Sequence, residues 1–574
     1  MSKISFRSNS YTANVLLLRM VKKLWVFVFV ITITLFYQGR DFNSRYERSI
    51  SSDGKGYYAY LPAIFIYQDP NYKFVDAMEL QYYPEDLSHA KHFKNKQRNG
   101  KSVNKYFPGL AILYLPFFAL SSLYAWLAGI PIDGYSNPFQ IGIGIAHVFY
   151  LFFGLYLIFR FLQKLNINSK ISSFLLITLI FGTNIYFYIV YQHAVGHIFY
   201  FFLASVLIWL TYKLIESKKT KWIGRICVLM ALIFIVRPTN ILMLFFIPFI
   251  FQLFNENLIV FLRTHFRWKE IIIYVPFSFL VLMIAPVLWK WQCDLWIVYS
   301  YNKEGFNFRT HNWIKFLFSY RKGWFLWTPL AFIYFSLASY FLFKKSIALG
   351  LKFIIPFFIT IYVLSSWWYW AYGDSMGQRS MIDFYPFLII GVAVILQNFK
   401  YKNAVILIAI PLSLLNIVQA FQVRYGILKG DHTDSKAYWN HFLQLKTDAP
   451  TFEIDKSWER IAFQEDCVPQ KTDTLLPFSR CIESKALNDV RKIVVTLTVG
   501  GKHGNKNISL VVSNIKGDLY HYANLYGVVY EKPRKMSFGF DIPLKKKEVY
   551  KTYIWNSNTN ETVEIQNMSV KYFK

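Results

Sequence analysis

The stretch IIIYVPFSFLVLMIAPVLW, residues 271 to 289, decides the class of fold. It contains no charged residue, and it is about as long as the roughly 20 residues that an α-helix needs to cross the hydrocarbon core of a bilayer. A second stretch of this kind runs from Ala404 to Phe421. The whole chain is 55% hydrophobic and only 17% charged. The sequence therefore predicts a polytopic α-helical membrane protein.

Hydropathy predicts about eleven transmembrane helices. The first follows Arg19, Lys22 and Lys23, and no small-residue cleavage site comes after it, so we interpret it as a span and not as a signal peptide. The predicted spans lie near residues 24–38, 140–162, 172–191, 196–214, 222–236, 240–256, 270–290, 324–343, 353–371, 383–398 and 404–421.

Short basic loops predict the orientation of these spans, because such loops stay on the cytoplasmic side. The alternate loops then face outward, including the long first loop at residues 39–106. The net charge of +30 favours contact with membrane lipids. It does not favour nucleic acid, since no basic domain stands apart from the predicted bundle. The basic loops are Lys164–Lys170, Lys218–Arg225, Arg263–Lys269, Lys344–Lys352 and Lys400–Lys402.

The apolar segment from Phe107 to Ala128 does not fit this alternation, because a crossing there would turn the later basic loops outward. Pro108 and Pro116 interrupt it. We expect a re-entrant or interfacial element on the outer side, since proline breaks helices and irregular backbone is tolerated where protein covers it. A twelfth span is the alternative.

The pattern changes after Phe421 to short runs of β-branched and aromatic residues. The sequence predicts a transmembrane domain at 1–421, a linker region at 422–480 and an extracytoplasmic β-sandwich at 481–574. Cys467 and Cys481 would form a disulfide there or remain two free thiols. The predicted strands are Lys492–Val499, Ile508–Val512, Lys535–Phe540, Tyr550–Trp555 and Val563–Val570.

Polar residues that are out of place near hydrocarbon collect in the predicted outer turns. Ionisable groups there are costly, so their convergence from separate turns indicates a site better than any one of them does. They are Asp53 and Lys55 after the first span, His193 and His197 between two spans, Arg237 and Asn240, Lys322, and Asp374 and Arg379 in the aromatic segment that starts at Trp367.

These features resemble polytopic glycosyltransferases of the GT-C type, which include the protein O-mannosyltransferases and the aminoarabinose transferases of lipid A. The resemblance covers about the first 420 residues. It is carried by Asp53 in a large first loop, by Arg237-Pro238, and by the pattern Trp-x-x-Trp-x-x-Gly-x-x-x-Gly-x-Arg that ends at Arg379. It implies transfer of a sugar from a polyprenyl-phosphate carrier to a glycan, lipid or protein acceptor outside the cytoplasmic membrane.

Asp53 stands alone where well-known members have an adjacent acidic pair. Metal use is therefore open, with Mg²⁺ or Mn²⁺ as the candidate ions. A bacterial inner membrane is expected, and an endoplasmic-reticulum location would give the same topology.

Sugar transfer of this kind needs a base for the acceptor hydroxyl and cations for the leaving phosphate. Asp53 is the candidate base and Asp374 a second carboxylate. Arginine suits a phosphate because its planar fork can bind two oxygens. The candidate phosphate ligands are Arg379, Arg237, Lys322 and Lys55, and the candidate substrate-binding residues are Tyr57, Tyr58, His193, His197, Asn240, Trp368 and Tyr372.

Each assignment has a structural alternative. Asp53 would also suit a helix N-cap, and Arg379 a charged anchor at the membrane interface. His193 and His197 have the i, i+4 spacing of a zinc pair, but no third ligand is evident, so hydrogen bonding to substrate and interfacial packing are the other interpretations. Asp383, near the start of a predicted span, is expected to pair locally.

Two other functions stay open at this point. One is a membrane transporter or lipid flippase, which would place ionisable residues and broken helices near the bilayer midplane. The other is a non-catalytic envelope protein that binds glycan. A nucleotide-sugar donor is disfavoured, because the sequence has no Walker loop and no dinucleotide-binding fingerprint.

Overall fold

The structure is a computed structural model, in which two compact units are distinguished. The described residues are 49–82, 93–97, 99–302, 304–309, 312–373, 375–428, 430–431, 433–445, 461–467, 478–484, 492–501, 508–514, 520–524, 534–541, 549–556 and 563–573. The predicted first span at 24–38 lies outside them, as does Asp374.

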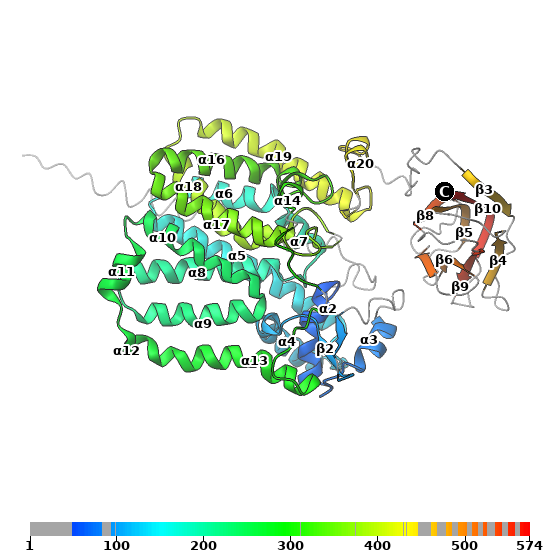
Figure 1. Ribbon diagram of the computed structural model, residues 1–574, viewed down its shortest axis with the longest axis horizontal. Coiled ribbons are helices and arrows are strands. Elements are labelled where there is room, and N and C mark those ends of the chain that lie inside the picture. Colours follow the sequence, from blue (N-terminus) through cyan, green and yellow to red (C-terminus); the bar gives the residue numbers. More distant parts are fainter. Residues whose placement is uncertain are drawn as a thin grey trace, which may run out of the picture. The chain divides into compact units, whose positions relative to one another are not determined.

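The first unit is a bundle of helices (Figure 1). Its elements in chain order are α2 (Asp53–Phe65), α3 (Phe74–Tyr82), β1 (Lys94–Lys96), β2 (Ser102–Asn104), α4 (Gly109–Leu127), α5 (Asn137–Lys164), α6 (Ser169–Phe181), α7 (Ile185–Tyr191), α8 (His197–Ser217), α9 (Lys221–Val236), η3 (Pro238–Phe246), α10 (Ile247–Leu253), α11 (Leu258–His265), α12 (Trp268–Ile271), η4 (Ile272–Tyr274), α13 (Val275–Cys293), α14 (Trp313–Phe318), α15 (Trp324–Trp327), α16 (Pro329–Lys345), α17 (Ile347–Ser365), η5 (Arg379–Phe384), α18 (Tyr385–Leu396), α19 (Lys402–Arg424) and α20 (Ser435–Asn440).

Membrane character is strong in this unit. Within the described residues, seven helices are long and apolar enough to cross a membrane, or nine if each of two bent pairs is counted as one span. The bent pairs are α6 with α7, at 61°, and Pro238–Leu253 with α11, at 86°. The chain is thus a mostly helical, polytopic protein of the multi-pass membrane class.

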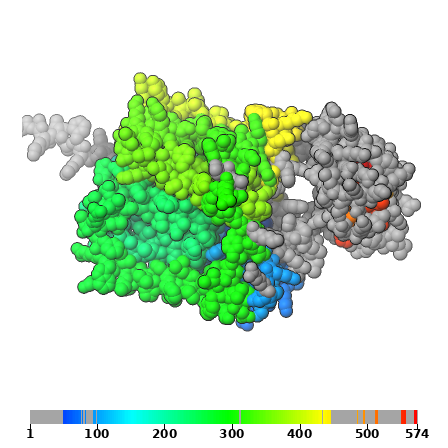
Figure 2. Space-filling model, in the orientation of Figure 1, coloured from blue at the N-terminus to red at the C-terminus, as the bar shows by residue number. Residues whose placement is uncertain are grey.

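Burial separates central helices from peripheral ones. We compare the share of an apolar 18-residue window that is buried in the structure. This share is 83% for the segment from Arg379 to Leu396 and 78% for α8, but only 6% for the segment from Trp268 to Cys293. The latter lies along one edge of the bundle in Figure 1, and the space-filling view shows this green part of the chain at the surface (Figure 2). An apolar helix with so little protein contact would face lipid.

One predicted span is wrong at its end. The sequence predicted a helix over 353–371, but α17 stops at Ser365. Further along, Tyr372, Gly373 and Gly377 all have positive φ, so the segment after α17 leads into irregular backbone. The chain after α17 instead pairs with an earlier loop, where Trp368 N donates to the carbonyl oxygen of Gly305 at 2.8 Å.

Three of the basic loops lie together at one end of the bundle. Lys164, at the end of α5, approaches Glu216 of α8 at 3.7 Å, and Lys218 approaches Glu256 at 3.6 Å. In Figure 1 this end carries α11 and α12, while α2 and α3 lie at the opposite end. The separation agrees with the predicted alternation of basic and outer loops.

The apolar segment expected to be re-entrant forms the continuous helix α4, with Pro116 inside it. By length and composition it qualifies as a span. Its first residue packs on Val236 at the end of α9, and Ser121 Oγ donates to the carbonyl oxygen of Pro138 at the start of α5. Pro116 therefore does not break the helix, and the irregular backbone on which the re-entrant interpretation rested is not present in α4.

The second unit contains two antiparallel four-stranded sheets. One has the order β3-β10-β5-β8 and the other β4-β9-β6-β7. Alternate residues Ile493, Val495 and Leu497 of β5 are buried, as expected for a sheet with one packed face. The strands are β3 (Ile461–Cys467), β4 (Phe478–Glu483), β5 (Lys492–Gly501), β6 (Ile508–Asn514), β7 (Tyr520–Asn524), β8 (Arg534–Asp541), β9 (Tyr550–Asn556) and β10 (Val563–Phe573).

All five predicted strands are present as β5, β6, β8, β9 and β10. The sheets begin earlier than expected, because β3 lies wholly inside the range assigned to the linker. Its run Ile-Ala-Phe-Gln-Glu-Asp-Cys is too polar at one end to give a clear alternation. The side chains of Cys467 and Cys481 lie outside the described ones, so the disulfide stays a prediction.

Candidate functional site

The Asp53 carboxylate is held by two side chains that come from distant parts of the chain. Tyr106 Oη donates to Oδ1 at 2.8 Å, and Arg379 Nη2 donates to Oδ2 at 2.7 Å. Asp53 is the first residue of α2, and Ser52 occupies the N-cap position before it. The ion pair with Arg379 joins this carboxylate to a segment 326 residues away in the chain.

Two glycines bring α2 close enough for this contact. A Cβ at Gly54 would lie 2.2 Å from the Cβ of Ala194, and a Cβ at Gly56 would lie 2.3 Å from the Tyr106 ring. Glycine is thus required because α2 packs directly on the turn before α8 and on the segment after β2. This packing places Asp53 beside residues of three other segments.

A change of Gly54 to alanine is expected to displace the start of α2 and with it Asp53, because the added methyl group would overlap backbone and side chain of Ala194. We expect a lower thermal unfolding temperature in detergent. Gly305→Ala is the matched control, since its new Cβ would meet only Tyr299 Oη at 3.7 Å. Equal unfolding temperatures for both variants would contradict the close approach.

Tyr106 is a second ligand of Asp53 that the sequence did not indicate. Burial raises the pKa of its phenol well above the ordinary value, and the neighbouring Asp53 charge raises it further. The hydroxyl therefore keeps its proton at neutral pH and acts as a donor to the carboxylate. Tyrosines are common in this chain, so no sequence signal distinguished Tyr106 from its neighbours.

A second carboxylate, Asp383, gathers three of the predicted site residues. Its side chain is fully buried. His197 Nδ1 lies 2.7 Å from Oδ1, and both Arg237 Nη1 and Asn240 Nδ2 donate to Oδ2, at 3.2 and 3.1 Å. The three partners come from α8, from the turn after α9 and from η3. This buried cluster joins the helices in the centre of the bundle.

The expectation that Asp383 pairs locally is wrong, since its partners lie 143 to 186 residues away in the chain. The physical reason is its position in η5, which packs against α8. A carboxylate beside a long apolar run is costly unless it is paired. That cost is the signal that could have identified Asp383 as part of the site.

Tyrosines connect the two clusters. The ring of Tyr57 lies 4.5 Å from that of Tyr106, and its hydroxyl accepts from Tyr200 Oη at 3.4 Å. The guanidinium of Arg237 lies 5.9 Å from the ring of Tyr200. Asp53 and Asp383 are thus linked through a continuous set of polar and aromatic contacts. Tyr57 lies between the two clusters, and its role as a substrate-binding residue stays a prediction.

Tyr372 also belongs to this set. Its ring lies 5.5 Å from the guanidinium of Arg237, and its hydroxyl donates to the carbonyl oxygen of Leu364 at 2.8 Å. Its φ of 58° is an uncommon left-handed conformation for a tyrosine. Aromatic rings therefore line Arg237 on two sides, and they hold the guanidinium in place next to Asp383.

The two predicted lysines are both buried. Lys322 Nζ donates to the carbonyl oxygen of Gly373 at 3.0 Å and to both oxygens of Ser375 at 2.5 Å. It thereby fixes the turn that leads to Arg379, which is a structural role in addition to the predicted one. Lys55 lies on α2, two residues after Asp53.

His193 and His197 have different partners. His193 Nε2 lies 2.5 Å from the carbonyl oxygen of Ile189, whereas His197 is bound to Asp383. Residues 192–196 between them are not helical, so the i, i+4 spacing does not place them on one helix face. Among the described residues, no group of three or more histidine, cysteine or acidic side chains lies close enough to hold a metal ion.

Two predicted substrate ligands lie away from these clusters. Tyr58 is buried between other aromatic rings, and its hydroxyl donates to the carbonyl oxygen of Gly134 at 2.5 Å. Trp368 is 56% exposed and packs on Tyr369. Tyr58 therefore supports the fold, and Trp368 lies on the surface of the segment that follows α17.

Comparison with protein-family models gives no match for this chain, and comparison with curated proteins gives none either.

Proposed function

We propose that this protein is a membrane glycosyltransferase of GT-C organisation, with about eleven or twelve transmembrane helices. It would transfer a sugar from a polyprenyl-phosphate donor to an acceptor hydroxyl at the outer face of the cytoplasmic membrane. The observation that carries the proposal is the pairing of Asp53 with Arg379 near a second partly buried arginine, Arg237, in a bundle of apolar helices. The two β-sheets would pack as an extracytoplasmic sandwich.

The geometry suits a base and a phosphate site in one place. The Asp53 carboxylate retains 24% exposure, so an acceptor hydroxyl can reach it and transfer its proton there. The Nε of Arg379 is buried without a hydrogen-bond partner among the described residues, and it can donate to a phosphate oxygen. Positive charge at that position would stabilise the negative charge that builds up on the departing polyprenyl phosphate.

The proposal is tested by incubating the purified, detergent-solubilised full chain with radiolabelled polyprenyl-phosphate sugars and with candidate acceptors. Release of polyprenyl phosphate with formation of a labelled glycoside is the expected result. A parallel reaction with a chelator tests whether Mg²⁺ or Mn²⁺ is needed. Binding of the donor lipid without turnover for every acceptor would count against a transferase.

A transporter or lipid flippase is the second candidate, and one observation favours it. The pair α6 and α7 is bent by 61° at Gly182 to Asn184, and broken helices line the substrate sites of many transporters. Movement of a fluorescent polyprenyl phosphate across reconstituted vesicles, without loss of its sugar, would support this function. Sugar transfer without such movement would support the enzyme.

A further inference from the structure

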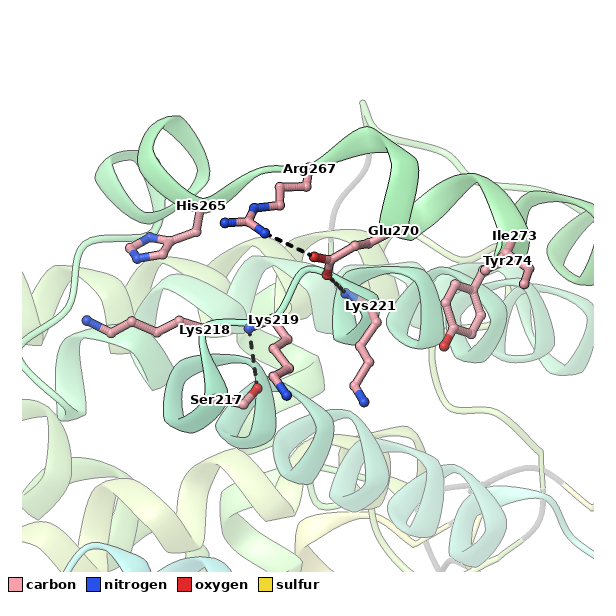
Figure 3. A pocket seen from close by; sticks show the side chains of 9 residues that line it. All are labelled: Ser217, Lys218, Lys219, Lys221, His265, Arg267, Glu270, Ile273 and Tyr274. Atoms are coloured by element: carbon pink, nitrogen blue, oxygen red, sulfur yellow. Dashed lines mark hydrogen bonds and ion pairs between the residues drawn. The ribbon is translucent and has the colours of Figure 1, made fainter.

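The structure has a second polar site, at the basic end of the bundle and far from Asp53 in the fold. A cavity of about 690 Å³ opens there between the α8–α9 turn, the end of α11 and the segment formed by α12 and η4. This volume is within the range of ordinary ligand pockets. The residues that line it are Ser217, Lys218, Lys219, Lys221, His265, Arg267, Glu270, Ile273 and Tyr274 (Figure 3).

The cavity is built by specific contacts between its three segments. Thr220 Oγ1 donates to the carbonyl oxygen of His265 at 3.2 Å, and the backbone N–H of Lys221 donates to Glu270 Oε2 at 3.1 Å. A Cβ at Gly224 would lie 2.2 Å from the Tyr274 ring, so η4 packs directly on α9. The basic side chains are thus carried by a fixed frame and not by a loose loop.

The charge of the cavity is positive. Its lining has three lysines and one arginine against the single carboxylate of Glu270. That carboxylate approaches Arg267 at 3.8 Å, and Lys218 approaches Glu256 at 3.6 Å. Among the described residues, Lys219 and Lys221 make no ion pair, and Figure 3 shows their ammonium groups pointing to the same side. Two uncompensated cations thus face one region.

An apolar surface begins at the edge of this cavity. Ile273 lines it and is exposed, and Phe277 and Leu280 continue an exposed apolar face along α13. Trp268 is exposed beside it, as expected for an aromatic residue at the level of lipid head groups. A ligand that fits both surfaces has an anionic head and long apolar chains.

We propose that this cavity binds the phosphate of an anionic phospholipid of the basic-side leaflet, with Lys219 and Lys221 as its main ligands and with the acyl chains along α13. The site is separate from the proposed transfer reaction and does not depend on it. The basic loops are predicted to lie on the cytoplasmic side, where they would contact anionic lipids of the membrane.

The test is native mass spectrometry of the purified full chain with phosphatidylglycerol or with phosphatidylcholine of the same acyl chains. Wild type should retain phosphatidylglycerol preferentially. Lys219→Gln with Lys221→Gln should weaken this binding about tenfold or more, because two cations near the head group are lost. Lys344→Gln with Lys345→Gln is the matched control, since these two exposed lysines end α16 at a basic loop outside the cavity.

Unfolding temperatures should agree among wild type and both double variants, because all four lysines are on the surface. Equal loss of lipid in both double variants would show that the lipid is attracted to basic residues in general. It would overturn the proposal of a specific site in this cavity. Equal retention of phosphatidylcholine would overturn the role of the anionic head group. Displacement of the lipid by inorganic phosphate at the same concentration would indicate a site for small anions. It would overturn the proposal that the ligand is a phospholipid.

Discussion

Replacement of Asp53 by asparagine is expected to lower sugar transfer by about 10²–10⁴-fold, because the amide cannot accept the acceptor hydroxyl's proton. Asparagine keeps the size of the side chain and an oxygen for Tyr106 or Arg379. The measurement is initial-rate transfer from a labelled polyprenyl-phosphate sugar at saturating donor. Donor binding should remain, so the loss is expected in kcat.

Asp294→Asn is the matched control. Asp294 is exposed and pairs with Lys101 on the same side of the bundle as Asp53, so its loss should leave transfer unchanged. Asp53→Glu retains the charge for Arg379 and moves the carboxylate by one methylene, and we expect a folded but much slower enzyme. Transfer at the wild-type rate by folded Asp53→Asn would rule out Asp53 as the base.

The sequence identified most members of this site but not their pairing. Asp53, Arg379, Arg237, His197 and Asn240 were all selected as polar residues in outer turns, and the structure brings each into one of two clusters. The contacts join residues that are 143 to 326 positions apart. A single sequence contains no information on such long-range pairs, whereas hydropathy is local and could be followed along the chain.

Spacing and residue type were weaker guides. His193 and His197 were considered together because of their spacing, but the chain between them is not helical and sends them to different partners. Among the predicted aromatic ligands, Tyr57 and Tyr372 lie in the clusters, whereas Tyr58 and Trp368 lie away from them. Aromatic residues suit both packing and the membrane interface, so residue type alone does not separate these two pairs.

The prediction with the largest effect on stability concerns Asp383. Asp383→Asn is expected to destabilise the protein by about 3–5 kcal/mol, because it removes the fully buried carboxylate and leaves the partly buried Arg237 without its partner. The amide would also turn a donor toward His197 or toward Arg237 and Asn240, which already donate. The measurement is the unfolding free energy, or the unfolding temperature, of the purified protein in a fixed detergent.

The control for this change is Glu304→Gln, which makes the same chemical replacement in the more exposed pair with Lys105 and should cost about 1 kcal/mol or less.

The double variant Asp383→Asn with Arg237→Gln tests whether the loss of stability comes from the unpaired arginine or from the other lost contacts of Asp383. If the unpaired arginine is the cause, removing it should recover part of the lost stability, with a coupling of about 0.5–3 kcal/mol. Additive losses in the double variant would mean that Asp383 does not stabilise the bundle through Arg237.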